Sequence, residues 1–243
     1  MDRMHFGEHS STQFNEALES IRNNLMEMGG LVEKQVVDAL QALLHADSDL
    51  AQKVLETEDK VDKLEMLIDE ECTRVLALRQ PAASDLRLII AVTKAVSDLE
   101  RIGDESAKIA RMGQQLAEEG ESPRGYVEVR HIGNHVRNML RDTLDAFARF
   151  DAKKALAVAA EDNEVDLEYR SAMRSLVTFM MEDPRSIGRV LNILWVLRSL
   201  ERVGDHARNV AEHVIYLVKG TDVRHIGLKR MEAEVKGSSA ADE

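Results

Sequence analysis

The sequence contains very little cysteine, proline and aromatic residue, and each scarcity excludes a class of protein. Its 243 residues include one cysteine, three prolines and 4% aromatic residues. The lone cysteine, Cys72, excludes a disulfide framework and any zinc site built from several cysteines, and it suits a reducing compartment. So few prolines and aromatic residues argue against a β-sandwich or barrel and favour an all-α fold of long helices.

Long apolar runs and a basic charge balance are also missing. The chain has no stretch of about 18 apolar residues, so we expect no membrane insertion. Residues 1–11 lack the apolar segment of a secretory signal. The formal net charge is −12, whereas binding to the phosphates of nucleic acids needs a basic surface. We therefore expect a cytoplasmic protein with no nucleic acid partner.

Most of the chain shows helical periodicity, and a few helix breakers divide it. Pro81 and Pro184 each stand at the start of a helical segment, and Pro123 lies among glycine, serine and charged residues. The polar segment after Gly220 is expected to be frayed or disordered. The predicted helices cover residues 12–46, 49–79, 82–117, 125–150, 152–181 and 185–219.

A six-residue block occurs twice in the chain. Leu99 to Asp104 read Leu-Glu-Arg-Ile-Gly-Asp, and Leu200 to Asp205, 101 positions later, differ only by valine for isoleucine. The prolines that precede these helices match at a similar offset, as a duplicated unit requires. The sequence therefore predicts two tandem three-helix bundles related by internal duplication. The predicted units are residues 1–120 for the first bundle, 121–220 for the second and 221–243 for a polar tail.

Four pairs of acidic residues, each spaced by four positions, recur at equivalent places in the two halves. Residues at this spacing share a helix face, and all four pairs flank the apolar seam of their helix on the same side. Two neighbouring helices in each bundle are therefore expected to bring four carboxylates together. The pairs are Glu58 with Asp62, Glu100 with Asp104, Asp162 with Asp166, and Glu201 with Asp205.

Carboxylates crowded in this way need a counter-charge. Oxygen-only ligands suit hard cations such as magnesium, manganese, calcium or iron, and Arg101 and Arg202, beside the glutamates, are competing partners. Single acidic pairs are also common on solvated helix faces, so this interpretation stays open. Gly103 and Gly204, inside the repeated blocks, indicate either close helix packing or room beside a bound ion.

The repeated block and the segment before it resemble the PhoU family, bacterial regulators of phosphate transport and signalling. The resemblance rests on Gln80–Arg87, on Asp98–Asp104 and on Leu200–His206, and it extends over residues 12 to 225. It implies two three-helix bundles, a cytoplasmic location and a non-enzymatic negative regulator. Such proteins act between a high-affinity phosphate ABC transporter, through its ATPase, and a phosphate-sensing histidine kinase, and they are often homodimers.

The resemblance also implies a metal-binding role, because some members of the family bind metal clusters through such acidic pairs on adjacent helices. The metal itself, among Mg, Mn, Fe and Zn, is left open. Asp98 of the first half is Ser199 in the second, and Glu58 becomes the shorter Asp162, so the second site is the less certain. The implied metal ligands are Glu58, Asp62, Glu100, Asp104, Asp162, Asp166, Glu201 and Asp205.

A ferritin-like di-metal carboxylate enzyme is the main alternative. It would need two Glu-x-x-His motifs, but only Glu128 and His131 have that spacing. His131 and His135 share a helix face and are expected to be surface or dimer-contact residues, although a metal is an open reading. His206 and His213 are expected to pack along the sixth helix.

The third and sixth helices carry apolar residues on a second side as well, which must cover another surface. We expect this side to contribute to a homodimer or partner contact. It includes Leu86, Ile90, Ile187, Leu191 and Leu194.

Overall fold

The computed structural model describes residues 12–81, 83–118 and 125–237. Within these ranges every regular element is a helix, and seven of them are α-helices. They are α1 (Thr12–His45), α2 (Ser48–Arg79), α3 (Ala83–Glu118), α4 (Tyr126–Arg149), α5 (Ala152–Glu182), α6 (Ile187–Lys219) and α7 (Leu228–Lys236), with a 3₁₀ turn, η1 (Pro184–Ser186), before α6.

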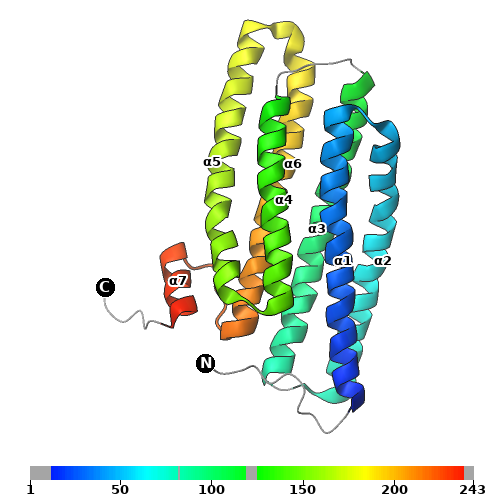
Figure 1. Cartoon of the computed structure of the whole chain (residues 1–243), viewed down its shortest axis with the longest axis vertical. Helices are drawn as coiled ribbons and strands as arrows, with labels where there is room; N and C mark the ends of the chain where they lie inside the picture. Colours follow the sequence, from blue (N-terminus) through cyan, green and yellow to red (C-terminus); the bar gives the residue numbers. More distant parts are fainter. Residues whose placement is uncertain (1–11, 82, 119–124, 238–243) are drawn as a thin grey trace.

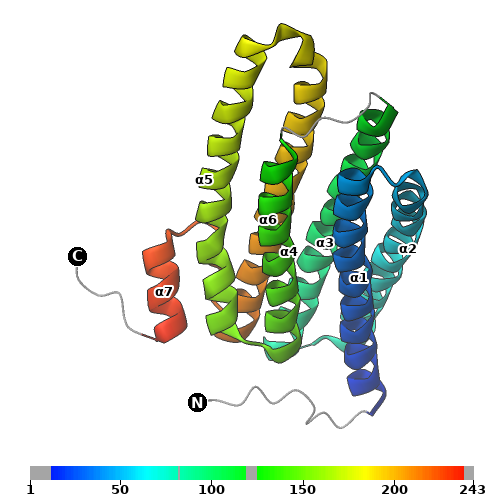
Figure 2. The ribbon, with the colours of Figure 1, turned by 45° about the horizontal axis from the view of Figure 1, so that its top comes forward.

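The helices form two three-helix bundles, α1–α3 and α4–α6, which lie side by side (Figures 1 and 2). The bundles meet where α3 packs against α6 and α1 packs against α4. The predicted all-α fold and its duplication are confirmed, and each of the six long helices ends within two residues of its expected bounds. Among the described residues, no helix is long and apolar enough to cross a membrane. Pro123, at the expected join between the repeats, lies outside the described residues.

The connection between the first and second helices of each bundle ends in the same kind of helix cap. Asp47 precedes α2 and accepts a hydrogen bond from the backbone N–H of Leu50, and Asp151 precedes α5 and accepts from Lys153 and Lys154. Such an aspartate satisfies N–H groups that have no partner within the helix. In each repeat the cap follows a residue with positive φ. The duplication therefore preserves the chemistry of the corner as well as the helix lengths.

The apolar seams predicted for the third and sixth helices form the core. Leu99 and Ile102 of α3, and Leu200 and Val203 of α6, are fully buried. Cys72 is also buried, and burial raises the pKa of its thiol to about 11. A thiol that stays protonated at neutral pH is a poor nucleophile, so Cys72 serves as a core residue.

Glycines allow α1 and α4 to approach closely. A Cβ added to Gly29 of α1 would lie 2.5 Å from Leu144 Cδ2 of α4, and one added to Gly133 of α4 would lie 2.5 Å from Leu40 Cδ2 of α1. Gly29 corresponds to Gly133, and Leu40 to Leu144, each 104 positions apart. The contact is thus reciprocal, and each leucine fills the space that the other helix leaves open.

We expect Gly29→Leu to destabilise the protein by about 1–3 kcal/mol, because the added side chain overpacks the contact with Leu144. Gly30 is the matched control, since a Cβ there would meet nothing within 4 Å. Gly30→Leu should be neutral or stabilising, as leucine is the better helix former. Urea unfolding of the two variants measures the difference, and equal stabilities would contradict the close approach.

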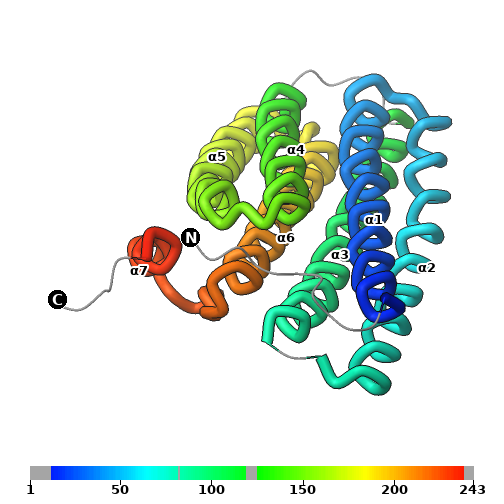
Figure 3. Tube along the Cα trace, turned by 60° about the horizontal axis from the view of Figure 1, so that its bottom comes forward, coloured from blue at the N-terminus to red at the C-terminus, as the bar shows by residue number. Residues whose placement is uncertain are grey.

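The segment after Gly220 is ordered, so the expectation of a frayed tail was wrong for residues 221–236. Helix α7 packs against α5 (Figure 3). Its Met231 and Val235 are buried, and so is Val223 in the connection. The polar composition concealed a short amphipathic helix that buries Met231 and Val235. Residues 238–243 lie outside the described part of the chain.

Candidate functional site

The first acidic cluster comprises Glu58 and Asp62 of α2 and Glu100 and Asp104 of α3. Burial raises the pKa of Glu58 against the opposing charge of Arg111, and the carboxyl groups of Asp104 and Asp62 add to the shift. Burial raises the pKa of Glu100 too, and the negative charges of Asp104, Glu65 and Asp62 add to the shift. The structure therefore brings the predicted residues together, with Glu65 as an additional member.

The second acidic cluster comprises Asp162 and Asp166 of α5 and Glu201 and Asp205 of α6. Asp162 and Glu201 are buried. Burial, followed by repulsion from Asp205, raises the pKa of Glu201 to about 7. The pKa of Asp205 is raised by burial and then by the charge of Asp162. The negative charges of Asp162, Asp166 and Asp205 thus all act on Glu201, as the spacing predicted.

Arginines contact the two clusters unequally. In the first, Arg111 lies 3.4 Å from Glu58. Arg202, expected as a competing partner in the second cluster, instead pairs with the buried Glu105 of α3 at 3.2 Å. Ion pairs with the second cluster come from three other arginines: Arg170 to Asp166 (3.3 Å), Arg198 to Glu201 (2.5 Å) and Arg208 to Asp162 (3.0 Å).

The donor set suits a hard cation, because each cluster offers carboxylate oxygens from two facing helices. In the part of the chain that the structure describes, however, no three or more His, Cys, Asp or Glu side chains are close enough to hold a metal. Glu201 Oε2 is buried without a hydrogen-bond partner, which leaves one oxygen free for a ligand. A cation would thus need the carboxylates to turn towards one another.

The two glycines of the repeated blocks lie in closely packed places. A Cβ on Gly103 would stand 3.1 Å from Gln35 Oε1, and one on Gly204 would stand 3.4 Å from Val136 and 3.5 Å from Val165. Of the two readings left open by the sequence, these distances support close helix packing. The glycines let the third helix of each bundle approach its neighbours beside the acidic residues.

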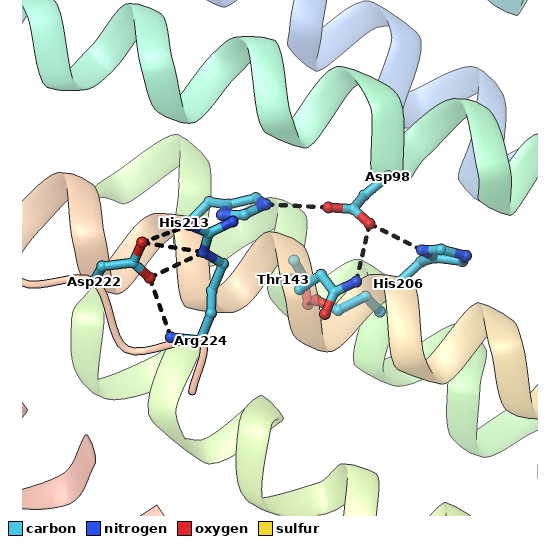
Figure 4. Close-up of polar contacts among 8 residues, drawn as sticks. Asp98, Thr143, His206, His213, Asp222 and Arg224 are labelled. Carbon is cyan, nitrogen blue, oxygen red and sulfur yellow. Dashed lines mark hydrogen bonds and ion pairs between the residues drawn. The ribbon is translucent and has the colours of Figure 1, made fainter. Parts of the chain in front are cut away.

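A polar cluster between the two bundles was missed from the sequence. Asp98 of α3 reaches across to α6, where its carboxylate accepts hydrogen bonds from His206 Nδ1 (2.9 Å), Asn209 Nδ2 (3.0 Å) and His213 Nε2 (3.1 Å) (Figure 4). Both histidines are buried. They lie on the sixth helix as predicted, yet they are partners of Asp98 and not only packed against the core. The sequence feature that could have revealed this cluster is the difference between the repeats at this position, which is Asp98 in the first and Ser199 in the second.

The hydrogen bonds to Asp98 predict acid sensitivity. Burial opposes ionisation of this carboxyl, but the donors His206, His213 and Asn209 outweigh it and lower its pKa from 3.8 to about 2. The ionised Asp98 carboxylate therefore stabilises the fold by about 2 kcal/mol above pH 3.8, and this stabilisation is lost as pH falls towards 2. Urea unfolding between about pH 5 and pH 2 should show this loss. In Asp98→Asn the pH dependence should be correspondingly flatter.

His131 and His135 contact one glutamate of the neighbouring helix. Both rings lie 3.2 Å from Glu168 of α5. His131 is largely exposed, in agreement with the expected surface position, and with Glu128 it lines a surface pocket of about 410 Å³. The two histidines thus join α4 to α5 within one bundle.

Comparison with known proteins matches both bundles to one family. The family model described as "PhoU domain" matches residues 25–112 and 129–214. The chain belongs to the PhoU family. It is 68% identical to a "Phosphate-specific transport system accessory protein PhoU homolog" of Pseudomonas putida, over 96% of this chain and 91% of that protein.

Solved PhoU structures share the fold. The crystal structure of PhoU from Pseudomonas aeruginosa has a TM-score of 0.85 and 67% identity, and covers 86% of this chain and 100% of that one. The phosphate transport system regulatory protein PhoU from Streptococcus pneumoniae has a TM-score of 0.80 and 31% identity, with 87% and 99% covered. PhoU proteins are accessory and regulatory proteins, so this chain is not an enzyme and the ferritin-like alternative is set aside.

Proposed function

We propose that this protein is a cytoplasmic negative regulator of phosphate uptake and phosphate-starvation signalling. It would act as an adaptor between the ATPase of a phosphate ABC transporter and a phosphate-sensing histidine kinase. The match of both bundles to the PhoU domain carries this proposal, together with relatives named as phosphate-specific transport accessory proteins. An adaptor needs surfaces that bind its partners, and it needs no catalytic groups. The long helices supply such surfaces.

The apolar residues expected on a second side support a contact surface. Ile187, Leu191 and Trp195 of α6 are exposed and recur every four residues along one face of the helix. Leu86 of α3 is also exposed, but it lies near the opposite end of α6. Exposed apolar residues that gather on one helix face mark interaction sites more often than scattered ones. Ile90 and Leu194 are half-buried. We propose that this side contributes to the homodimer or to a partner contact.

A pull-down from phosphate-rich and phosphate-starved cells tests the adaptor role. Wild-type protein should recover the transporter ATPase and the sensor kinase, and Leu191→Glu should recover less of at least one of them. Val127→Glu is the matched control, because Val127 is also an exposed apolar residue, on α4. Recovery of neither partner by folded wild-type protein would contradict the proposal.

We also propose that the acidic clusters bind a metal ion, from the set Mg, Mn, Fe and Zn. A bound cation would neutralise the crowded carboxylates and join the two helices that carry them. Burial raises the pKa of Glu58, Glu100 and Glu201, and repulsion from neighbouring carboxylates adds to each shift. A cation would relieve this repulsion, which supports the proposal. Elemental analysis of protein purified without an affinity tag tests it, and Glu100→Gln with Asp104→Asn should reduce the metal content. Absence of metal, with no stabilisation on adding any, would refute it.

A further inference from the structure

We propose that a surface pocket between the two bundles binds a small molecule that carries a short chain of phosphate groups. The pocket has a volume of about 470 Å³ and lies where α3, α6 and the connection between α6 and α7 (residues 220–227) meet. Small-molecule sites in proteins measure roughly 300–1,000 Å³, so the pocket is large enough for such a ligand. The inference concerns residues outside the two acidic clusters and does not depend on the proposed metal binding.

Cationic side chains line the pocket from two parts of the fold. Lys94 and Arg101 come from α3, and Arg224 comes from the connection after α6. Lys94 Nζ lies 5.7 Å from the centroid of the Tyr216 ring of α6, a cation–π contact that restrains the amine. The hydrogen bonds of Arg224 lower the pKa of Asp222, and the charge of Lys94 acts in the same direction. Lys94 and Arg224 therefore lie in one region of positive charge.

The acidic residues in and beside the pocket already have partners of their own. Asp98 accepts hydrogen bonds from two histidines and an asparagine of α6. Glu212 is buried and pairs with Arg208 at 3.0 Å. Arg224 holds Asp222 through its Nε and Nη2 atoms, which leaves Nη1 for a ligand (Figure 4). The negative charges at the pocket are thus balanced before the two cations of α3 are counted.

The duplication shows why Arg101 is available to a ligand. Its equivalent in the other repeat is Arg202, which pairs with the buried Glu105 of α3. The residue equivalent to Glu105 is His206, which donates a hydrogen bond to Asp98 and supplies no carboxylate to Arg101. Within the part of the chain that the structure describes, Arg101 is exposed and has no ion pair or hydrogen bond. An exposed arginine that lacks an acidic partner and lines a pocket is suited to bind an anion.

The spacing of the groups on α3 favours an extended anion. Thr93, Ser97 and Arg101 follow one another at intervals of four residues, so they share a helix face. Lys94 and Arg101 are seven positions apart, which is about 10 Å along the helix axis. Two or three linked phosphate groups can extend between these cations past the hydroxyl of Ser97, whereas a single phosphate ion is too short. Guanidinium and ammonium groups form strong hydrogen bonds with phosphate oxygens.

Isothermal titration calorimetry of the full chain with sodium tripolyphosphate, in buffer without divalent cations, tests the pocket. Wild-type protein should bind one tripolyphosphate, and Lys94→Ala with Arg101→Ala should weaken binding at least tenfold. Lys60→Ala with Lys63→Ala is the matched control, because it removes the same charge from exposed positions of α2. This control should change the affinity less than twofold. Absence of binding to folded wild-type protein, or an equal loss from both double variants, would overturn the proposal.

Three further probes define the chemistry of the ligand. Orthophosphate and citrate should each bind at least tenfold more weakly than tripolyphosphate, because neither is a chain of phosphates that extends between the two cations. ATP carries the same chain on a nucleoside. Tighter binding of ATP than of tripolyphosphate would identify a nucleotide and weaker binding an inorganic chain, and either result supports the proposal. Orthophosphate or citrate that binds as tightly as tripolyphosphate would overturn it.

Thermal unfolding separates a change in the pocket from a change in the fold. Lys94 and Arg101 form no ion pair among the described residues, so without ligand their double alanine variant should unfold close to the wild-type temperature. Saturating tripolyphosphate should raise the midpoint of wild-type protein and leave that of the variant unchanged. Ser97→Glu, which adds a negative charge at an exposed position, should abolish binding in the same way. Wild-type affinity in Ser97→Glu, or equal stabilisation of the double variant, would contradict a site in this pocket.

Discussion

Asp98→Ala is expected to lower the free energy of unfolding by about 3 kcal/mol. The substitution removes three hydrogen bonds to a charged acceptor, each of which contributes about 1.5–3 kcal/mol when unshared. It also leaves His206, His213 and Asn209 without the carboxylate that they share. Because both histidines are buried, water cannot fully replace the lost partner. Urea unfolding at neutral pH measures the loss.

Two variants make this experiment specific. Ser199→Ala changes the equivalent position of the other repeat, which carries no such cluster, and should alter stability by less than about 0.5 kcal/mol. Asp98→Asn keeps the shape of the side chain and one acceptor oxygen, so its loss should be smaller than that of alanine. If Asp98→Ala unfolds at the same urea concentration as Ser199→Ala, Asp98 does not join the bundles as described.

Arg208→Ala is expected to cost about 3 kcal/mol or more. Breaking a buried ion pair from one side leaves a charge that water cannot reach, and Arg208 is the partner of both Asp162 and Glu212. Burial already raises the pKa of both carboxyls while Arg208 lowers it. Without the guanidinium these groups should take up a proton at higher pH. The loss of stability should therefore be larger at pH 7 than at pH 5.

Arg111→Ala is the control for this experiment. Arg111 is half exposed and lies 3.4 Å from Glu58, and an ion pair of this kind contributes less than about 1 kcal/mol. Chemical denaturation of both variants at the two pH values gives four free energies to compare. Equal losses from Arg208→Ala and Arg111→Ala would mean that the second cluster does not depend on its arginine.

Polar contacts join the two bundles of the duplicated fold. Asp98 binds residues of α6, and Arg202 of α6 binds Glu105 of α3 at 3.2 Å. The two bundles are thus joined by charged groups in addition to apolar packing. Such contacts fix the register of one bundle against the other, because the buried Glu105, His206 and His213 would lose their partners on sliding. The proposed adaptor would thus present both bundles to its partners together.

The helices could be predicted because their signals are local. Prolines and apolar periodicity each act within a few residues, and the duplicated block supplies the architecture. The gathering of the acidic pairs followed from the same periodicity. The clustering of Glu58 with Asp104 required only that α2 and α3 be neighbours, which a three-helix bundle guarantees.

The contacts between bundles could not be predicted in the same way. Asp98 and His206 are 108 positions apart, and their meeting depends on which face of α3 meets α6. No local sequence pattern predicts which face of α3 this is.

The arginines of the second cluster were missed for different reasons. Arg170 and Arg198 pair within their own helices at spacings of four and three residues, a local signal that was overlooked. Arg208 of α6 reaches Asp162 of α5, which no local pattern predicts. Helix α7 was missed because its polar composition outweighed two buried apolar residues.

Phosphate uptake by living cells tests the central claim most directly. Cells that lack this protein are compared with cells that express it, and uptake of radiolabelled phosphate is measured in phosphate-rich medium. A negative regulator predicts higher uptake in its absence, restored to the original rate by wild-type protein. Unchanged or lower uptake in cells without the protein, with the transporter present at equal levels, would contradict the account.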